Sequence, residues 1–277
     1  MVEVREWSRS DTARYFRPPT PEDDKYARGV VALRTGSPAY PGAAVLGVEA
    51  AWRAGAGFVR FVGDERVADR VLTRRPETVV GADAGHSRVD AWVIGSGTDP
   101  AQRTNDESIA LREILAGAAP VVIDAGALDL APGARAPFLV TPHAREFSRL
   151  RERLRVHTDG DERSEAAHQV AVKIGGTVLL KGARTLIAAP DAEVIAVEAG
   201  TGWLATAGTG DVLAGVLGAV TAANPGAPFA EVAAAGAWLH GHAARIAAGV
   251  IAGGPGHPIV AMDVAEALPL AIRDVWE

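Results

Sequence analysis

Short, uniformly apolar runs alternate with helical patterns along most of this chain, and this alternation constrains the fold more than any other feature. The runs lack alternating polar residues, so each is typical of a strand covered on both faces. They are residues 29–34, 58–62, 91–95, 120–124, 138–141 and 177–181. Helical patterns lie between them at residues 42–55, 106–117 and 161–176. The sequence therefore predicts an α/β fold with a central, mostly parallel sheet and helices on both faces.

The C-terminal third departs from this alternation. Two strand-like runs within residues 185–197 flank a Pro-Asp turn, which predicts a hairpin at the edge of the sheet. Only helical patterns follow, over residues 211–222, 230–249 and 263–275. Residues 1–25 are rich in proline and are expected to form an irregular segment, which leaves residues 26–277 as a single domain.

The composition argues against several classes of function. A chain of 277 residues with 48% hydrophobic content can bury a sizeable core. Its net charge of −6 and its lack of a basic stripe argue against a nucleic-acid partner. The absence of cysteine excludes disulfides, thiolate catalysis and cysteine-based zinc sites. Residues 1–16 are charged and lack the apolar core of a signal peptide, so we expect a cytoplasmic protein without membrane association.

The segment ATAGTGDVLAG, residues 205–215, puts three glycines and one carboxylate at the entrance to an apolar helical run. Glycines let the backbone approach a phosphate closely, and the first amides of a helix point toward a bound anion. Asp211 could then perform proton chemistry beside that anion. A plain turn with an N-cap explains the same residues, since Asp and Thr commonly begin helices. The segment alone leaves both interpretations open.

Polar or glycine-rich turns follow four of the strand-like runs. They read IGSGTDP, DAGAL, TPHAREF and KGART, and begin at residues 94, 124, 141 and 181. Ligands of open parallel sheets bind outside the carboxyl ends of the strands, so these turns predict one shared crevice if the sheet order brings them together. Each also has a plainer interpretation: Asp124 as a turn residue, His143 as a surface residue, and Lys181 as a side chain whose ammonium reaches water.

Standard motifs narrow the class of enzyme further. The chain has no P-loop, and the spacing from Gly208 to Gly215 is G-x-G-x-x-x-x-G rather than the Rossmann pattern. His240 and His242 are two residues apart, so on a helix they face different directions and a metal pair is not expected. They are interpreted as structural residues or as residues that support the site from behind. No protein ligand set for a metal is predicted.

Seven blocks of sequence, in order, resemble the ADP- or ATP-dependent NAD(P)H-hydrate dehydratases, which repair hydrated nicotinamide cofactors and belong to the ribokinase-like superfamily. The resemblance runs from Lys25 to the C-terminus. Many members carry an epimerase domain ahead of this one, which is not expected here. The blocks are residues 36–57, 93–99, 121–128, 140–150, 178–191, 207–220 and 235–244.

This resemblance implies roles for particular residues. Asp211 would be the general base that takes the proton of the hydrate's ring hydroxyl. The helix dipole is expected to lower its pKa and keep it ionised. Mg²⁺ would bridge the nucleotide phosphates, and ADP is the expected phosphoryl donor, with ATP as the alternative. The hydrate pocket would be shaped by Ala43, Gly97 and His143. The nucleotide would be held by Lys181, Gly182, Ala183, Arg184, Thr185, Gly208, Thr209 and Gly210.

Two departures from the family pattern bear on this assignment. Ala207 stands where the first glycine of the loop is usual, which matters only if that position needs a positive φ. Trp203 stands where an asparagine is usual, which removes a side-chain amide. Two alternatives stay open: a ribokinase-like kinase of a small alcohol such as a vitamin precursor, and an inactive adenylate-binding regulator. The expected partners are NAD(P)H hydrate, an adenine nucleotide and further copies of the chain, in a homo-oligomer such as a tetramer.

Overall fold

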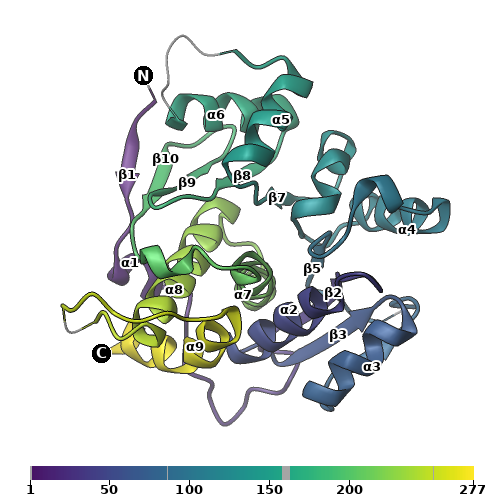
Figure 1. The fold of residues 1–277 in the computed structure, drawn as a ribbon, viewed down its shortest axis with the longest axis horizontal. Helices are drawn as coiled ribbons and strands as arrows, with labels where there is room; N and C mark the ends of the chain where they lie inside the picture. The colour runs from purple at the N-terminus through teal and green to yellow at the C-terminus, as the bar shows by residue number, and fades with distance from the viewer. Residues whose placement is uncertain (1, 86, 158–162, 252) are drawn as a thin grey trace.

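The computed structural model describes residues 2–85, 87–157, 163–251 and 253–277, and within them ten strands form one sheet (Figure 1). The strand order is β1-β10-β9-β8-β7-β6-β5-β2-β3-β4. The strands are β1 Val4–Glu6, β2 Val30–Arg34, β3 Phe58–Val62, β4 Val79–Gly81, β5 Ala91–Ile94, β6 Val121–Ile123, β7 Phe138–Val140, β8 Thr177–Leu180, β9 Thr185–Ala188 and β10 Val194–Val197. All six strand-like runs of the sequence therefore form strands.

The strands from β4 to β8 in this order run parallel, and adjacent members pair in register, as Ile94, Ile123 and Val140 do across β5, β6 and β7. Strand β9 pairs antiparallel with both β8 and β10. The predicted hairpin is thus present as β9–β10. Because β5, β6, β7 and β8 are consecutive neighbours, the four turns that follow them lie at one end of the sheet.

The helices are α1 Arg9–Ala13, α2 Pro41–Arg53, α3 Glu65–Arg74, α4 Asn105–Ala116, α5 Ala144–Leu154, α6 Arg163–Ile174, α7 Thr209–Ala223, α8 Phe229–Ala247 and α9 Ala261–Trp276. Three short 3₁₀ helices, η1 Pro100–Gln102, η2 Ala125–Gly133 and η3 Gly202–Leu204, follow β5, β6 and β10. Every helix predicted from the sequence is present, although residues 161 and 162 of one prediction lie outside the described residues. Helices α1 and α3 were not predicted as elements.

Two apolar layers cover the sheet, one on each face. Val93 belongs to the layer beneath α2, α7, α8 and α9, and the next residue, Ile94, to the layer beneath η2, α4, α5 and α6. Figure 1 shows these two groups of helices on opposite sides of the sheet. No helix in the described ranges is long and apolar enough to cross a bilayer.

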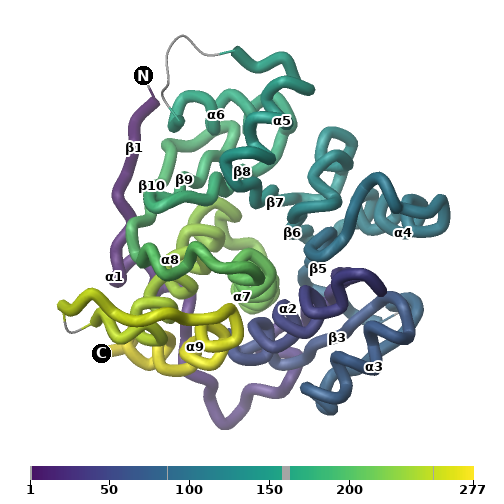
Figure 2. Tube along the Cα trace, in the orientation of Figure 1, coloured from purple at the N-terminus to yellow at the C-terminus, as the bar shows by residue number. Residues whose placement is uncertain are grey.

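The N-terminal segment differs from the expected irregular structure. Val4–Glu6 pairs in parallel with β10 and makes β1, not the hairpin, the edge of the sheet; Figure 2 shows this segment beside β10. Ser8 is the N-cap of helix α1. Its hydroxyl accepts from the Asp11 amide, and the Asp11 carboxylate accepts from the Ser8 amide. Strand β1 occupies backbone groups of β10 that would otherwise form an open edge.

Glycines let α7 pack closely and thereby position its N-terminus. A Cβ at Gly215 would lie 2.2 Å from the Gly47 carbonyl oxygen of α2, and one at Gly218 would lie 2.4 Å from the side chain of Val93 on β5. Larger residues would therefore push α7 away from both neighbours. The close packing places the start of α7, and with it Asp211, at the carboxyl end of the sheet.

Candidate active site

Four polar side chains meet at the carboxyl ends of β5, β6, β7 and β8. The centre is Asp124, which is 3% exposed. Its Oδ2 accepts from Ser96 Oγ at 2.9 Å, and its Oδ1 accepts from Thr141 Oγ1 at 2.7 Å. Lys181 Nζ donates to the same Oδ1 at 3.0 Å. Each of the four is the first polar residue after its buried strand, so the expected crevice exists. The sequence analysis did not predict that Asp124 lies at the centre of this cluster.

Asp124 and Lys181 form a buried ion pair in which each stabilises the charge of the other. Burial alone would raise the pKa of Asp124, but the Lys181 charge and the Thr141 and Ser96 hydroxyls bring it below its usual value. Burial alone would lower the pKa of Lys181, but the charges of Asp124, Glu146 and Asp211 bring it above its usual value. The pair therefore presents a fixed ammonium at the site.

Asp211 lies in the first turn of α7, beyond an N-cap, Gly208, that has a left-handed φ of 89°. The hydroxyl of Thr209 donates to the carbonyls of Leu204 and Thr206, both at 3.1 Å, and fixes the loop that enters the helix. The first amides of a helix have no partners within the helix and point outward. This geometry suits an anion, and a Cβ at Gly210 would lie only 3.6 Å from Lys181 Nζ.

The expected decrease in the pKa of Asp211 is wrong. Burial and the charge of Asp124 raise its pKa to about 6, and the opposing charge of Lys181 offsets only part of this increase. The sequence argument considered only the helix dipole, which is a weaker influence than the loss of water around the carboxylate. Asp211 is still ionised for the most part at pH 7, and a carboxylate with a pKa near 6 is a stronger base than an ordinary one.

A cavity of about 550 Å³ lies on one side of this centre, between the turn after β8 and the start of α7. We call it the nucleotide cavity, after the ligand that the sequence resemblance implies for its residues. It is lined by His143, Lys181, Gly182, Ala183, Thr185, Gly200, Thr201, Gly202, Leu204, Ala205, Thr209, Gly210, Leu213 and His240. Most of the residues assigned to the nucleotide from sequence therefore line one space. Arg184 and Gly208 do not line it. The Arg184 guanidinium pairs with Glu6 of β1 and with Glu198.

A second cavity, of about 570 Å³, lies on the other side of the centre, along α5. We call it the α5 cavity. It is lined by Tyr40, Gly97, Thr98, Asp99, Pro100, Ala125, Gly126, Leu128, Asp129, Glu146, Arg149, Leu150 and Arg153. Ala43 is buried behind its wall: a Cβ at Gly97, where φ is 67°, would lie 2.3 Å from the Cβ of Ala43.

His143 and Glu146 lie at the start of α5, and each lines a different cavity: His143 the nucleotide cavity and Glu146 the α5 cavity. The Glu146 carboxylate accepts from the His143 amide at 2.8 Å, while the His143 ring accepts from the amides of Arg145 and Glu146. His143 therefore caps α5 and at the same time lines the nucleotide cavity rather than the α5 cavity. The sequence assigned His143 to the hydrate, whereas in the structure it lines the cavity that also contains the residues assigned to the nucleotide.

The two histidines of α8 face different directions, as their spacing predicted. His242 stacks on Trp238 and lies 3.0 Å from Asp274 of α9. His240 is 7% exposed and lines the nucleotide cavity, and burial lowers its pKa to about 4. Its Nε2 has no hydrogen-bond partner among the described residues. A neutral imidazole therefore lines the cavity, which agrees with the interpretation of His240 as a residue that supports the site.

The two departures from the family pattern have simple structural outcomes. Among described residues other than glycine, only Ala125 and Arg155 have a positive φ, so Ala207 fits its position without strain. The indole of Trp203 is turned toward the Pro255 carbonyl, to which it donates at 2.8 Å. Neither residue lines the nucleotide cavity, although Gly202 and Leu204 beside Trp203 do.

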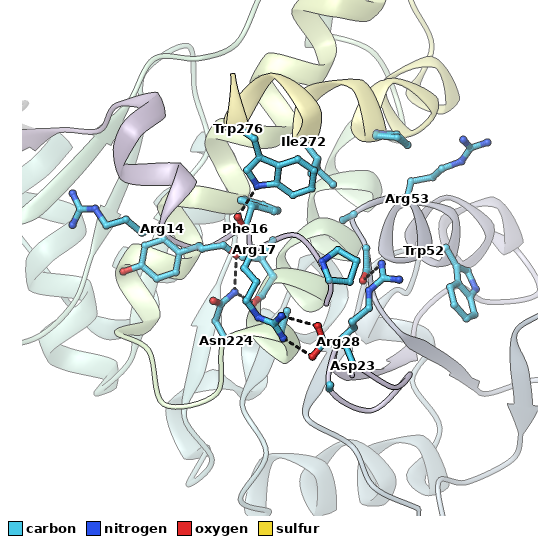
Figure 3. A pocket seen from close by; sticks show the side chains of 18 residues that line it. Arg14, Phe16, Arg17, Asp23, Arg28, Trp52, Arg53, Asn224, Ile272 and Trp276 are labelled. Carbon is cyan, nitrogen blue, oxygen red and sulfur yellow. Dashed lines mark hydrogen bonds and ion pairs between the residues drawn. The ribbon is translucent and has the colours of Figure 1, made fainter. Parts of the chain in front are cut away.

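A third cavity, of about 510 Å³, lies away from this site, near the C-terminal ends of α2, α7 and α9 (Figure 3). Its arginines are already engaged. Arg17 pairs with Asp23 through two bonds of 2.6 and 2.9 Å, and Arg28 donates to the Gly55 carbonyl at 2.8 Å. Arg53 donates to the buried Glu49 at 3.0 Å. We therefore place the active site at the strand ends and not here.

The site does not supply a set of protein ligands for Mg²⁺. The oxygens of Asp124 are committed to Lys181, Thr141 and Ser96. Within the described ranges, no three histidine or carboxylate side chains converge on one point. Mg²⁺ commonly binds through substrate phosphates with only one or two carboxylates.

The parallel sheet, the β9–β10 hairpin and the glycine-rich entrance to α7 beside a carboxylate define an α/β fold whose candidate site lies at the carboxyl ends of the strands. A ribokinase-like superfamily protein of Enterococcus faecalis shares this fold, with a TM-score of 0.83 at 22% identity over 98% of this chain and 96% of its own. That likeness concerns the fold alone.

The chain belongs to the NAD(P)H-hydrate dehydratase family, whose sequence model matches residues 31–252. It is 42% identical over 243 residues to the bifunctional NAD(P)H-hydrate repair enzyme Nnr of Mycobacterium tuberculosis, covering 84% of this chain and 49% of that protein. It thus spans about half the length of this curated relative. The ADP-dependent (S)-NAD(P)H-hydrate dehydratase of Neisseria meningitidis is 36% identical over 265 residues, 86% of each chain.

A solved structure supports the same relationship. The ADP/ATP-dependent NAD(P)H-hydrate dehydratase of Bacillus subtilis, co-crystallized with ATP/Mg²⁺, has a TM-score of 0.83 at 25% identity, and the match covers 98% of this chain and 99% of that one. The family resemblance read from the seven sequence blocks is therefore confirmed.

Proposed function

We propose that this chain converts (6S)-NAD(P)H hydrate to NAD(P)H and consumes ADP to AMP and phosphate. The observation that carries the proposal is the position of Asp211. This carboxylate, with a pKa of about 6, stands at the entrance of α7, and its charge acts on the Lys181 ammonium, which lines the nucleotide cavity. One cavity can hold the nucleotide and the other the hydrate, so the reacting hydroxyl and the terminal phosphate meet beside Asp211.

The chemistry follows from this placement. Asp211 accepts the proton of the ring hydroxyl as its oxygen attacks the terminal phosphorus of the nucleotide. A new P–O bond forms, and the bond between phosphorus and the AMP oxygen breaks. The amides at Gly208, Thr209 and Gly210 and the Lys181 ammonium stabilise the negative charge on the transferring group. The ring nitrogen then expels phosphate, and loss of a proton from the neighbouring carbon restores the double bond.

The Asp124–Lys181 pair has a positioning role. Because Asp124 is fixed by two hydroxyls and is almost fully buried, it holds the Lys181 ammonium beside Gly210 at 3.0 Å from its own Oδ1. Charge stabilisation in a water-poor site is strongest when the donors are fixed in advance. Mg²⁺, brought with the nucleotide, would neutralise phosphate charge.

The direct test is to incubate the protein with NADH hydrate, Mg²⁺ and ADP, and to follow the near-UV absorbance of reduced nicotinamide. The absorbance should rise and phosphate should appear in equal amount. A kinase that stops after phosphorylation would instead accumulate a phosphorylated product without that absorbance. A chain that binds AMP but consumes neither substrate would be an adenylate-binding regulator. Light scattering on the same sample would test the proposed homo-oligomer.

ADP is the proposed donor because the Neisseria meningitidis relative, 36% identical and covered over 86% of its length, is an ADP-dependent dehydratase. The reacting phosphate must reach both Asp211 and the amides of Gly208 to Gly210. An ADP enzyme places the β-phosphate there, so the adenosine must lie one phosphate closer to Asp211 than in an ATP enzyme. ATP bound in the same cavity would crowd the hydrate or shift out of line, and a misplacement of about 1 Å can cost about 10²-fold in rate. The ratio of kcat/KM for ADP and ATP at saturating Mg²⁺ and hydrate measures this. A higher kcat/KM for ATP would refute the placement of the β-phosphate beside Asp211. It would not contradict the proposal that the chain dehydrates NAD(P)H hydrate.

A further inference from the structure

Two arginines of α5, Arg149 and Arg153, line the α5 cavity. Neither makes an ion pair or a side-chain hydrogen bond with any part of the chain that the structure describes. They are four residues apart, so they lie one above the other on the same face of the helix. Glu146 and Leu150 share that face and also line the cavity. Both guanidinium groups are therefore presented to the same space.

The carboxylates of this cavity, by contrast, are all engaged. Asp129 accepts two bonds from Arg103, at 2.6 and 3.0 Å. Glu146 accepts from the His143 amide at 2.8 Å, and Asp99 caps η1 by accepting from the Ala101 amide at 2.9 Å. Among the charged groups that line the α5 cavity, Arg149 and Arg153 are therefore the ones with hydrogen-bond donors to offer a ligand. An anion is the complementary ligand, and guanidinium groups suit phosphate because of their paired donors.

The remaining wall is apolar and aromatic. Leu128 and Leu150 form buried surface, and the ring of Tyr40, 59% exposed, stands at the opening. A flat aromatic group can stack on such a ring and bury its other face against the leucines. The α5 cavity thus combines a surface for a planar base with two cations for phosphate, which is the chemistry that recognises a nucleotide.

A second nucleotide needs a source, and the proposed substrate supplies one, so this inference rests on the proposed function. NAD(P)H hydrate is a dinucleotide. Its reacting ring must lie near Gly97 and Asp211, and the nucleotide cavity is taken by the phosphoryl donor. Its adenosine half must then extend elsewhere, and Gly97 is one of the residues that line the α5 cavity. Seven residues of helix separate Glu146 from Arg153, about 10 Å along the axis. That reach fits a dinucleotide extending away from the reacting centre.

We propose that the α5 cavity binds the adenosine half of NAD(P)H hydrate, with Arg149 at its pyrophosphate and Arg153 at the 2′-phosphate that only the NADPH form carries. Glu146, whose charge acts on Lys181, marks the end of the cavity nearest the reacting centre. Arg149 is the nearer of the two arginines along α5, and Arg153 is one turn further away. The cavity therefore sets the preference between the two hydrates.

The test measures KM for NADPH hydrate and for NADH hydrate at saturating ADP and Mg²⁺. Arg149→Gln should raise both KM values about tenfold, because both substrates carry the pyrophosphate. Arg153→Gln should raise the ratio of KM for NADPH hydrate to KM for NADH hydrate about tenfold. The KM for ADP reports on the other cavity and should stay within about twofold of wild type in both. Arg70→Gln, which removes an exposed arginine of α3, is the matched control for loss of charge.

A second measurement is independent of turnover: calorimetric titration of the wild type and both variants with NADPH and NADH. The wild type should bind NADPH more tightly than NADH, and Arg153→Gln should remove the difference. This result would support the subsite even if the protein dehydrated no hydrate, in which case only the proposed function would fail. If Arg153→Gln changes KM or affinity equally for both forms, the 2′-phosphate assignment is overturned. If Arg149→Gln and Arg153→Gln behave like Arg70→Gln, the cavity does not bind the adenosine half.

Discussion

Replacing Asp211 with asparagine should make the protein more stable and less active, and the pH dependence of the gain follows from the structure. Burial and Asp124 raise the pKa of Asp211 from 3.8 to about 6. The folded state therefore binds the proton more tightly than the unfolded state, so ionising Asp211 destabilises the fold. This penalty is absent below pH 4, grows as the pH rises through 6 and is constant above. Two units of pKa correspond to about 3 kcal/mol at pH 8, and about half of that at pH 5.

Asp211→Asn removes the charge and keeps the shape of the side chain. We expect the free energy of unfolding at pH 8 to rise by up to about 3 kcal/mol, a Tm increase on the order of 6 °C for a chain of this size. The gain should halve at pH 5. Turnover should fall about 10²–10⁴-fold, as for loss of a general base, while ADP still binds. Thermal unfolding at several pH values and the absorbance assay measure the two effects.

The control is Asp69→Asn, which removes an exposed carboxylate of α3. Its effect on Tm should be small at every pH. A stability gain in Asp211→Asn that did not depend on pH, or a loss at pH 8, would refute the claim that burial of this charge costs folding free energy. Near wild-type turnover would refute the base assignment and leave Asp211 as a helix-capping residue.

The remaining predictions concern the same centre. In the wild type, kcat/KM should fall about tenfold per pH unit below about pH 6, as Asp211 takes up its proton; a profile flat down to pH 5 would contradict this. Lys181→Ala and Thr185→Ala should weaken AMP binding more than binding of a hydrate analogue, because both residues line the nucleotide cavity; equal losses in calorimetry would place the turn in the wrong half of the site. Gly97→Ala should lower Tm and raise the hydrate KM, because its Cβ would lie 2.3 Å from that of Ala43 at a φ of 67°. Gly133→Ala, whose Cβ would meet nothing within 4 Å, is the control, and equal Tm values for the two variants would refute the steric argument.

The central sheet could be predicted from sequence because its strands are buried on both faces. Residues such as those of β6 and β7 are apolar throughout, and that pattern requires no knowledge of distant partners. Strand β1 could not be found in this way. Its three residues, Val4–Glu6, have no distinctive pattern, and they form a strand only because β10 offers an unpaired edge. The same tertiary contact turns Arg184 toward Glu6 and away from the nucleotide cavity.

The chemistry of the site divides in a similar way. The sequence by itself determined the glycine-rich entrance to α7, Asp211 and Lys181, because backbone freedom, a helix start and a strand end are local properties. Only the tertiary structure decided that Asp124 is the buried partner of Lys181, that the pKa of Asp211 rises, and that Arg149 and Arg153 face a cavity beside Gly97. The physical reason is that burial and charge act over a few ångströms through space. Lys181 and Asp124 are 57 residues apart in the chain but 3.0 Å apart in the fold.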